Sequence, residues 1–590
     1  MLATAVGLLG LLPHLAFMHE VGEFQNFHDA YDEDSYVLSW LRGTLRPTRA
    51  LSGAALSLLY AACSSSLDAT LVVSDFVFPF LATCAAYFAV SQLLSSRMAR
   101  VLGTLLLVFA NDFFSLGNLV VWSDAHLNIV AFSRAFHFVA PNLVPSYETH
   151  FLAIFRTPEP QVSSALMFLI LGLLARLVGS ENVTRRGLDV LLIGAIAALP
   201  LGYTFITLPI AALVGGMVVV FAMSGRKHAV AITTLGLAGA VVVASLAYFW
   251  QQAQGQSAQS LFSALSYASR APIVTPAVIA SVVFSSAFGI WLALQKSRSP
   301  LAFLALGCLL LPFVISNQQI ISGVMISARD WERNVSYPLL VFGAMAAAAQ
   351  IWPTFESRYS AKVIGVACLG CLTILLRAQW ITFRLWEPIN LESIAIVRAL
   401  NSTDPALVHR ARLTFEDAGI SQLVQVRMKD SIDAPLSFYK VGMNLIPVMA
   451  PGATEAGVSP YENLVFEHWL RTNVSAADAE RLLRTEIQQG VGTFTNYLFA
   501  FRDAWYPASD NRAVRRVELE RSVRSIIGRY AVFIGPENRR RLAAEPALLI
   551  SSRAPAQLPS SPWIRNDAIG SAGVHGVTAY IYRQSIRPDS

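Results

Sequence analysis

Long apolar runs separated by short charged segments fill the first two thirds of the chain. Runs of about 16–24 residues bounded by charge are long enough to cross a bilayer as helices. The sequence has eleven such candidate spans, near residues 2–18, 69–93, 101–120, 161–179, 187–202, 205–224, 229–250, 275–295, 300–316, 336–352 and 362–376. The fifth and sixth come from one apolar stretch that is too long for a single crossing, and we divide it at Leu201-Gly202-Tyr203. The pattern predicts a polytopic α-helical membrane protein.

Beyond Arg377 the apolar runs stop, and charged residues are spread through 390–590. Ser475 with Asp478 three positions later is a capping pattern that opens a helix. The pattern in this part predicts helices at 475–489, 512–529 and 536–545 and strands at 530–535, 547–550 and 577–582. We therefore expect two domains, a transmembrane domain at 1–380 and a soluble, extramembranous α/β domain at 390–590.

The composition agrees with a membrane protein. Only 14% of the residues are charged and 54% are hydrophobic, whereas a soluble protein has about 25% charged residues. The net charge of +6 does not indicate nucleic-acid binding, because the basic residues fall in small groups between apolar runs. These groups are Arg97/Arg100, Arg185/Arg186, Arg226/Lys227, Lys296/Arg298 and Arg358/Lys362.

The basic groups occupy alternate short loops, which the positive-inside rule places in the cytoplasm. The N-terminus is then inside, and the domain that follows the last span is outside. The loops 19–68, 121–160, 251–274 and 317–335 all fall on this outer face. We expect a multi-pass protein of the plasma membrane, with the C-terminal domain in the periplasm if the host is a Gram-negative bacterium.

An acidic cluster lies in the first outer loop, at Asp29, Asp32, Glu33 and Asp34, flanked by His28 and Tyr36. Carboxylates this close to the hydrocarbon are unfavourable unless they face water, a cation or a partner. Asp32 or Glu33 could take a proton from a hydroxyl nucleophile. Asp32 and Asp34 could equally hold a divalent cation such as Mg²⁺ or Mn²⁺. A solvated acidic loop is the plain alternative.

Two further outer loops carry polar motifs. The first is Arg156-Thr-Pro-Glu-Pro-Gln161 at the start of the fourth span, where two prolines fix the backbone. The planar guanidinium of Arg156 suits a phosphate group. The alternative is that Arg156 only extends its charge to the membrane interface. Asn317-Gln318-Gln319 is followed by Arg329 and Trp331. Side-chain amides at the end of a span need hydrogen-bond partners, which sugar hydroxyls can supply, and Trp331 could stack on a sugar ring or lie in an interfacial belt.

Together, the anchor helix, the Asp32-Glu33 motif, the Arg-x-Pro-x-Pro-Gln motif and the Asn-Gln-Gln-x-x-x-Gly motif resemble the bacterial GT-C glycosyltransferase superfamily over residues 1–380. The resemblance implies an inverting enzyme that uses a polyprenyl-phosphate-linked sugar on the outer face. It implies that Asp32 or Glu33 is the base, that Arg156 and Arg329 bind the donor phosphate, and that other polar residues bind substrate. These are His28, Asp29, Tyr36, Gln161, Asn317, Gln318, Gln319 and Trp331. The chain departs from the pattern at Glu159, which puts a negative charge beside Arg156.

The acceptor, whether glycan, lipid or protein, is open, and we expect membrane lipid but no nucleic acid as a partner. No glycine-rich phosphate loop points to a nucleotide donor. The alternatives are a secondary transporter and a non-catalytic protein of envelope assembly. A transporter places ionisable groups near the bilayer midplane. Asp75, Asp112 and Arg176 are the only charges well inside the predicted spans, and the other polar groups concentrate at the outer face. This distribution favours the glycosyltransferase.

Overall fold

The computed structural model describes residues 1–25, 49–114, 152–155, 160–179, 186–253, 266–268, 270, 272–296, 299–326, 331–352, 361–416, 420, 424, 427, 460–489, 512–544, 546–558 and 563–587. The chain divides into two compact units. The first consists of Met1–Glu20, Asp32–Gly255 and Ala268–Arg384, and the second of Val21–Tyr31, Gln256–Tyr267 and Leu385–Ser590. Each unit is described by itself.

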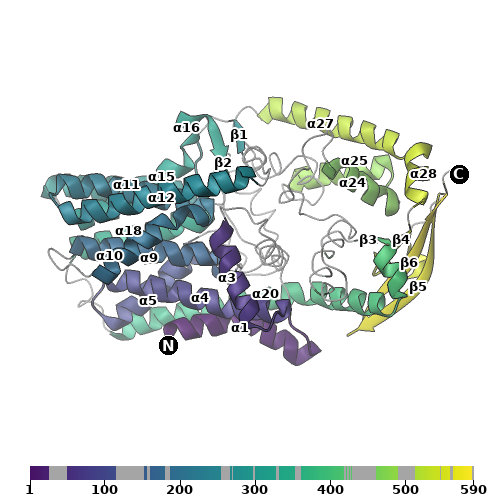
Figure 1. Cartoon of the computed structure of the whole chain (residues 1–590), viewed down its shortest axis with the longest axis horizontal. Helices are drawn as coiled ribbons and strands as arrows, with labels where there is room; N and C mark the ends of the chain where they lie inside the picture. Colours follow the sequence, from purple (N-terminus) through teal and green to yellow (C-terminus); the bar gives the residue numbers. More distant parts are fainter. Residues whose placement is uncertain are drawn as a thin grey trace. The chain divides into compact units, whose positions relative to one another are not determined.

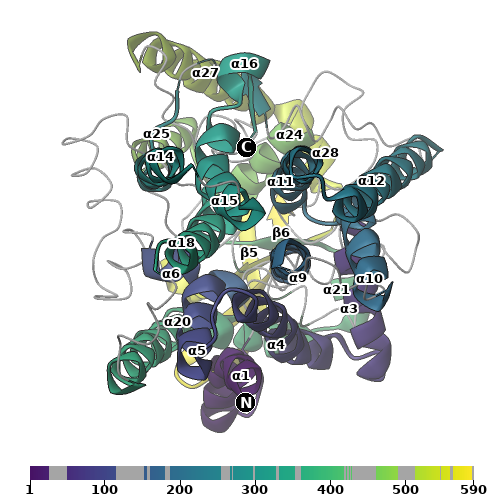
Figure 2. The same ribbon diagram turned by 90° about the vertical axis from the view of Figure 1, so that its left-hand side faces the viewer.

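Most described elements of the first unit are helices, packed side by side with roughly parallel axes (Figure 1) and seen nearly end-on in Figure 2. In chain order the helices up to residue 401 are α1 (Leu2–Val21), α3 (Ala50–Ala62), α4 (Leu67–Ser91), α5 (Arg97–Val108), α6 (Ala110–Phe114), α9 (Gln161–Gly179), α10 (Arg186–Ala197), α11 (Thr204–Met223), α12 (Lys227–Ala253), α14 (Pro276–Gln295), α15 (Pro300–Ser316), α16 (Gln319–Ser322), α18 (Tyr337–Ile351) and α20 (Ala361–Asn401). Shorter elements are η2 (Ala153–Phe155), η3 (Leu199–Leu201), the π-turn η4 (Glu332–Ser336), β1 (Ser266–Ala268) and β2 (Val324–Ile326).

Among the described residues, nine helices are long and apolar enough to cross a membrane. They are Leu2–Val21, Ala69–Ser91, Gln161–Gly179, Thr204–Met223, Lys227–Trp250, Pro276–Gln295, Pro300–Ser322, Glu332–Ile351 and Lys362–Asn401, and each coincides with a predicted span. The predicted span at 101–120 falls on α5, of 12 residues, and α6, of 5 residues, and its last residues lie outside the described part of the chain. The predicted span at 187–202 falls on α10, of 12 residues. The count of eleven crossings therefore stays a prediction. Helix α3 was not predicted, because its residues were assigned to a loop.

The long apolar stretch at 187–224 does contain a break. Helix α10 ends at Ala197 and α11 begins at Thr204, so the predicted division at Leu201-Gly202-Tyr203 is confirmed. The backbone N–H of Tyr203 donates to Ser163 Oγ at 2.8 Å. A Cβ at Gly202 would lie 2.9 Å from Thr207 Cγ2, so the absence of a side chain lets this turn pack against α11.

Short connections make successive helices antiparallel, so the first unit has two chemically different ends. One end, which we call the basic end, carries Arg97, Arg100, Arg226, Lys227, Lys296 and Lys362. Two of these cap helices, since Arg100 Nε donates to Leu94 O at 2.7 Å and Arg226 Nη1 to Val178 O at 2.6 Å. The opposite end, which we call the polar end, is where α4, α9, α11, α14 and α18 begin and where α6, α15 and α16 end.

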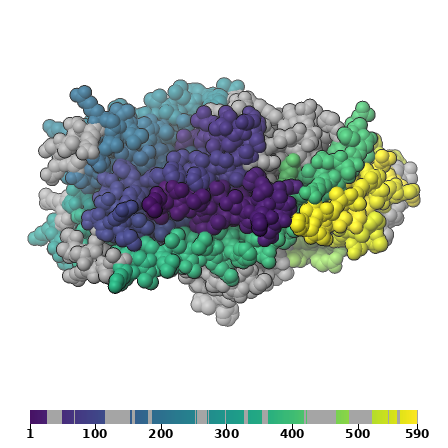
Figure 3. Space-filling model, turned by 90° about the horizontal axis from the view of Figure 1, so that it is seen from below, coloured from purple at the N-terminus to yellow at the C-terminus, as the bar shows by residue number. Residues whose placement is uncertain are grey.

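Helix packing in this unit uses small residues. A Cβ at Gly343 in α18 would lie 3.1 Å from the carbonyl oxygen of Ala305 in α15, which shows how closely the two backbones approach. Small residues permit such contacts between membrane helices, where the lipid provides no hydrophobic drive for association. Helix α1, purple in Figure 3, lies along the surface, and Gln379 Nε2 in α20 donates to Leu9 O at 2.7 Å.

Helix α20 corrects the predicted end of the last span. The span was expected to stop at residue 376, but the helix has 41 residues and runs to Asn401. Beyond Arg377 buried apolar residues such as Ile381, Trp386 and Ile394 continue in the helix. One buried face is enough to sustain a helix, and the exposed side of this part of α20 mixes charged residues such as Arg384 with apolar ones such as Trp380.

The second unit combines helices with a four-stranded sheet in the order β3-β4-β6-β5. Its further elements are α21 (Pro405–Arg410), β3 (Arg412–Phe415), α24 (Pro460–Arg471), α25 (Ala476–Gln489), α27 (Arg512–Phe533), α28 (Pro536–Ala543), β4 (Ala547–Ser551), η6 (Pro555–Gln557), β5 (Ile564–Val574) and β6 (Val577–Ile586). Strand β3 is parallel to β4, whereas β6 is antiparallel to both β4 and β5.

The predicted helices at 475–489, 512–529 and 536–545 and strands at 547–550 and 577–582 are confirmed, but the strand at 530–535 is wrong. Those residues fall in and after the last turn of α27. Ile526, Tyr530 and Phe533 recur at helical spacing and join one buried cluster with Phe466 and Trp469. The aromatic run has high strand propensity, and tertiary packing overrides it.

Candidate functional site

The acidic loop lies outside the described residues. This applies to His28, Asp29, Asp32, Glu33, Asp34 and Tyr36, and also to the two predicted phosphate-binding residues Arg156 and Arg329. The residues on either side of the acidic loop are described, and both flanks are held by side-chain contacts.

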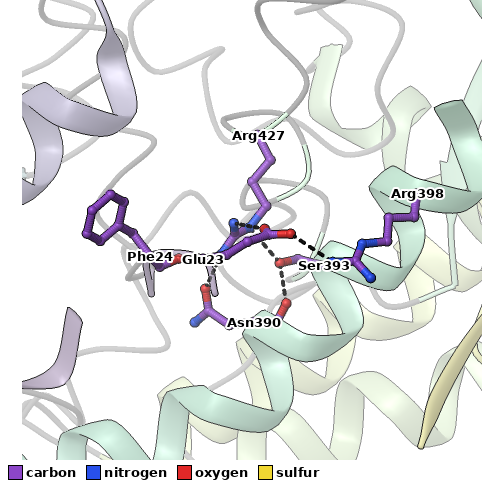
Figure 4. A network of polar contacts seen from close by, with 6 residues as sticks. All are labelled: Glu23, Phe24, Asn390, Ser393, Arg398 and Arg427. Atoms are coloured by element: carbon purple, nitrogen blue, oxygen red, sulfur yellow. Dashed lines mark hydrogen bonds and ion pairs between the residues drawn. The ribbon is translucent and has the colours of Figure 1, made fainter. Parts of the chain in front are cut away.

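The flank before the loop is held by Arg427 (Figure 4), whose side chain is only 9% exposed. Its Nη1 lies 3.1 Å from Glu23 Oε2, and its Nη2 donates to the Phe24 carbonyl oxygen at 2.9 Å. The same guanidinium reaches α20, with Nη2 to Asn390 Oδ1 at 2.7 Å and Nε to Ser393 Oγ at 3.0 Å. All these residues belong to the second unit. We call this set of contacts the Arg427 clamp.

A second arginine shares the Glu23 carboxylate. Arg398 Nη2 lies 3.2 Å from Glu23 Oε1, and its side chain is 50% exposed. Exposed ion pairs of this kind add little stability. Arg427 is different, because a buried guanidinium with several directed hydrogen bonds fixes geometry as well as charge.

The flank after the loop belongs to the first unit. The guanidinium carbon of Arg49, which directly precedes α3, lies 5.8 Å from the ring centroid of Tyr203. The Tyr203 ring contacts Phe205 at 5.2 Å, and Phe205 meets Trp331 edge-on at 6.1 Å. A cation over an aromatic face is attracted by the ring quadrupole. We call Tyr203, Phe205 and Trp331 the aromatic row. It lies at the polar end, at the start of α11 and just before η4 and α18.

Trp331 belongs to this aromatic row. It is only 4% exposed, and its ring packs edge-on against Phe205. A tryptophan at the end of a span suits both an interfacial belt and a sugar site, so stacking of Trp331 on a sugar ring stays a prediction.

Within the predicted amide motif, two residues shape their own loop. Asn317 Oδ1 accepts from the Ile273 N–H at 2.7 Å, and Asn317 Nδ2 donates to the Ile273 carbonyl at 3.1 Å. Gln318 Nε2 donates to Val324 O at 2.7 Å, and its Oε1 accepts from Ser322 Oγ at 2.7 Å. The predicted contacts of these amides with sugar hydroxyls stay a prediction. Gln319 is fully buried.

Gly323 completes this loop. Its φ of +74° is a left-handed conformation, and a Cβ would lie 3.2 Å from Arg270 Nη2. Arg270 Nη1 donates to the carbonyl oxygens of Ile320 at 2.9 Å and Ile321 at 3.2 Å, which lie in the short helix α16. The arginine thus satisfies carbonyls that the helix leaves without partners.

Gln161, the first residue of α9, has 0% exposure. Among the described residues, neither its Nε2 nor its Oε1 has a hydrogen-bond partner. A buried amide without partners is unfavourable. Gln161 is the described member of the Arg-x-Pro-x-Pro-Gln motif, and its predicted contact with substrate stays a prediction.

Buried ionisable groups gather toward the polar end. His14 Nε2 in α1 lies 2.8 Å from Asp75 Oδ2 in α4, with the two side chains 2% and 7% exposed. Asp112 Oδ1 accepts from the backbone N–H of Ala153 in η2 at 3.2 Å. The sequence pointed to Asp75 and Asp112 as charges inside spans but not to His14. The signal that could have found His14 was a histidine inside an otherwise apolar run.

The π-turn η4 places another buried set where α18 begins. Glu332 Oε1 accepts from Tyr337 Oη–H at 3.3 Å and from the Ala277 N–H at 3.4 Å. Arg333 Nε donates to Asn334 Oδ1 at 3.2 Å. Glu332, Arg333 and Asn334 are 2%, 7% and 3% exposed. π-Turns inside helices are frequent at functional sites, and a sequence pattern does not reveal them.

Among the described residues, no group of three or more His, Cys, Asp or Glu side chains could hold a metal ion. The predicted ligands Asp32 and Asp34 lie outside this part of the chain, so the cation stays a prediction. No protein-family model matches the chain, and no curated protein matches it either. The chain is therefore defined by its own architecture, a largely helical protein with helices fit to cross a membrane and a smaller unit that carries a sheet.

Proposed function

We propose that this protein is an integral-membrane, inverting glycosyltransferase that takes its sugar from a polyprenyl phosphate. The observation that carries the proposal is the anchoring of both flanks of the acidic loop, through the Arg427 clamp on Glu23 and Phe24 and through Arg49 over Tyr203. A loop that only needs to be soluble has no use for such anchors, whereas catalytic groups must be held in place by their surroundings.

In the proposed reaction, Asp32 or Glu33 accepts the proton of an acceptor hydroxyl. The resulting oxygen nucleophile attacks the anomeric carbon from the face opposite the leaving group. The bond between that carbon and the phosphate oxygen breaks, and the polyprenyl phosphate leaves with the electron pair. Arg156 and Arg329 would stabilise the negative charge that develops on the phosphate. A Mg²⁺ or Mn²⁺ ion held by Asp32 and Asp34 would supply further positive charge there.

The test uses near-isosteric variants of the two acids. Asp32→Asn or Glu33→Gln should lower sugar transfer from a polyprenyl-phosphate donor by about 10²–10⁴-fold, the range typical of losing a general base. Glu20→Gln is the matched control, because Glu20 is an exposed carboxylate at the end of α1. The proposal fails if both acid variants transfer sugar at the wild-type rate.

A second candidate is a proton-coupled transporter, which the buried His14–Asp75 pair favours. Ionisable pairs inside membrane helices often lie on proton pathways. In sealed vesicles a transporter would acidify or alkalinise the lumen in response to substrate, and Asp75→Asn would abolish that signal. A glycosyltransferase gives no such proton flux.

A further inference from the structure

We infer that the exposed side of helix α27, in the second unit, binds the phosphate groups of anionic membrane lipids. The surface consists of four exposed residues, Arg521, Arg524, Arg529 and Val532, and we call it the arginine face. The inference concerns an interaction surface and does not depend on sugar transfer, so it goes beyond the proposed function.

The buried side of α27 determines which residues face outward. Ile526, Tyr530 and Phe533 recur at helical spacing and lie in one core cluster with Leu542 of α28. Helices α27 and α28 thus pack on the same core. The arginine face therefore has a fixed orientation within the second unit.

A line of residues with few large side chains runs along the exposed side of α27. Arg521 and Val532 are eleven positions apart, which is about three helical turns, so they lie on the same line along the helix. Between them this line has only small residues, Ser525 and Gly528. Arg529 Nη1 donates to Ser525 Oγ at 2.6 Å, so its guanidinium lies beside the line. A flat partner can approach such a surface closely.

The charge of this region is strongly positive. Residues 521–544 contain six arginines and one acidic residue, Glu537, which gives a net charge of +5. The whole chain has a net charge of only +6. The preceding residues 512–520 add three arginines and two glutamates to the same helix. A concentration of charge of this kind creates a local positive potential that attracts anions.

The acidic residues at the start of helix α25 are paired within that helix. Helix α25 packs on the same core cluster as α27, so its carboxylates could in principle neutralise the arginine face. However, Asp478 forms an ion pair with Arg481, and Glu480 forms one with Arg484. These carboxylates therefore do not cancel the excess of arginine over acid on α27.

Three observations favour a lipid surface as the anionic partner. A guanidinium matches a phosphate with two parallel hydrogen bonds, and each basic residue near an anionic membrane strengthens binding by about fivefold. Val532 is 78% exposed among the arginines, and the interfacial region of a bilayer accommodates an apolar side chain. The second unit resumes at Leu385, inside the uninterrupted helix α20 that is also a candidate span. The chain itself therefore keeps lipid headgroups at a high local concentration.

The experiment measures how fast phenylglyoxal modifies each arginine of the full-length protein, with peptide mass spectrometry as the readout. The protein is reconstituted in nanodiscs of phosphatidylcholine alone or of phosphatidylcholine mixed with phosphatidylglycerol. Modification of Arg521, Arg524 and Arg529 should be about tenfold slower in the anionic nanodiscs, and high salt should restore the rate. Arg565 and Arg583, which are exposed on the sheet of the same unit, are internal controls and should react equally in both.

A pair of variants tests whether the protection comes from the arginine face. Val532→Glu places a carboxylate among the arginines and should reduce the protection to less than about twofold. Val532→Gln is the matched control without charge and should keep most of the protection. Because Val532 is exposed, neither variant disturbs the core, and both should elute as the same monodisperse species as wild type.

Equal modification of the three arginines in the two kinds of nanodisc would overturn the inference, and so would protection that Val532→Glu leaves unchanged. A soluble partner is tested by adding glycerol phosphate or the acidic polysaccharide polygalacturonate to the neutral nanodiscs. Protection by either of these, without protection in the anionic nanodiscs, would assign the arginine face to a soluble anion and overturn the assignment to lipid.

Discussion

The Nε2 atom of His14 lies 2.8 Å from Oδ2 of Asp75, so helices α1 and α4 share a buried acid–base pair. One hydrogen bond joins the two side chains across the interface of the helices. Gly10 lies one turn before His14, and a Cβ there would be 2.2 Å from the Asp75 carbonyl oxygen. Close backbone approach and the polar pair together hold α1 against α4.

We expect Asp75→Ala to destabilise the protein by about 3–5 kcal/mol, because it leaves His14 buried without its acceptor. The measurement is the thermal unfolding midpoint of the detergent-solubilised protein. Asp75→Asn is the matched control, since it keeps an acceptor oxygen at the same place and should lose much less. Equal midpoints for Asp75→Ala and wild type would show that the pair does not hold α1.

A second prediction concerns Asn317, whose amide makes two hydrogen bonds to the backbone of Ile273. Asn317→Ala leaves both backbone groups without their partner at a site only 7% exposed. We expect a loss of about 1–3 kcal/mol in the free energy of unfolding, with KM for the donor unchanged in the molecules that remain folded. A large rise in KM without loss of stability would instead support the substrate-binding role predicted from the sequence.

The helical architecture could be predicted from the sequence because apolar runs of membrane length have few alternative explanations. The break at Gly202 was predictable for the same reason, since the stretch around it was too long for one crossing. The extension of α20 was missed because residues 377–401 bury only one face, and a search for continuous apolar runs does not detect that pattern.

The candidate site was less predictable because its important relationships join residues that are distant in sequence. Glu23 and Arg427 are both ordinary charged residues until the fold brings them within 3.1 Å. His14 and Asp75 become a pair in the same way. The contacts of Trp331 with Phe205 and of Asn317 with the backbone of Ile273 likewise join residues that are distant in sequence, and contact of either side chain with a sugar stays a prediction.

A third prediction concerns the stability of the second unit at acidic pH. His468 in α24 is buried, and desolvation lowers its pKa from 6.5 to about 4. The unfolded chain therefore binds more protons than the folded chain between pH 6.5 and pH 4. Stability is highest above pH 6.5 and falls as the pH drops through this window, by about 3 kcal/mol at most.

The measurement is the unfolding midpoint of the second unit at pH 7 and at pH 4.5. His468→Gln cannot take up the proton, so the difference between the two pH values should shrink. His575, which is exposed in the turn between β5 and β6, gives the control His575→Gln with wild-type behaviour. The prediction is wrong if His468→Gln keeps the full pH dependence.

The last prediction is that the second unit lies on the outer side of the membrane. Helices α5 and α10 have 12 residues each, about 18 Å of helix, which is short for a hydrocarbon core of about 30 Å. The side of the membrane on which the second unit lies can be argued without counting α5 and α10 as spans. Arg226, Lys227, Lys296 and Lys362 lie at the basic end, and the positive-inside rule places that end in the cytoplasm. Helix α20 begins there, at Ala361, and so must end outside.

The experiment fuses reporters after Ser402, the first residue past α20, because a fusion at Arg377 would interrupt the helix. Alkaline phosphatase at Ser402 or Ser590 should be active, and green fluorescent protein at the same points should be dark. A fusion after Gly225, between α11 and α12 at the basic end, is the control and should show the reverse. Active phosphatase at Gly225 with an inactive fusion at Ser402 would mean that the whole bundle is inverted. The acidic loop would then face the cytoplasm, where a nucleotide-sugar donor would replace the polyprenyl-phosphate donor that we propose.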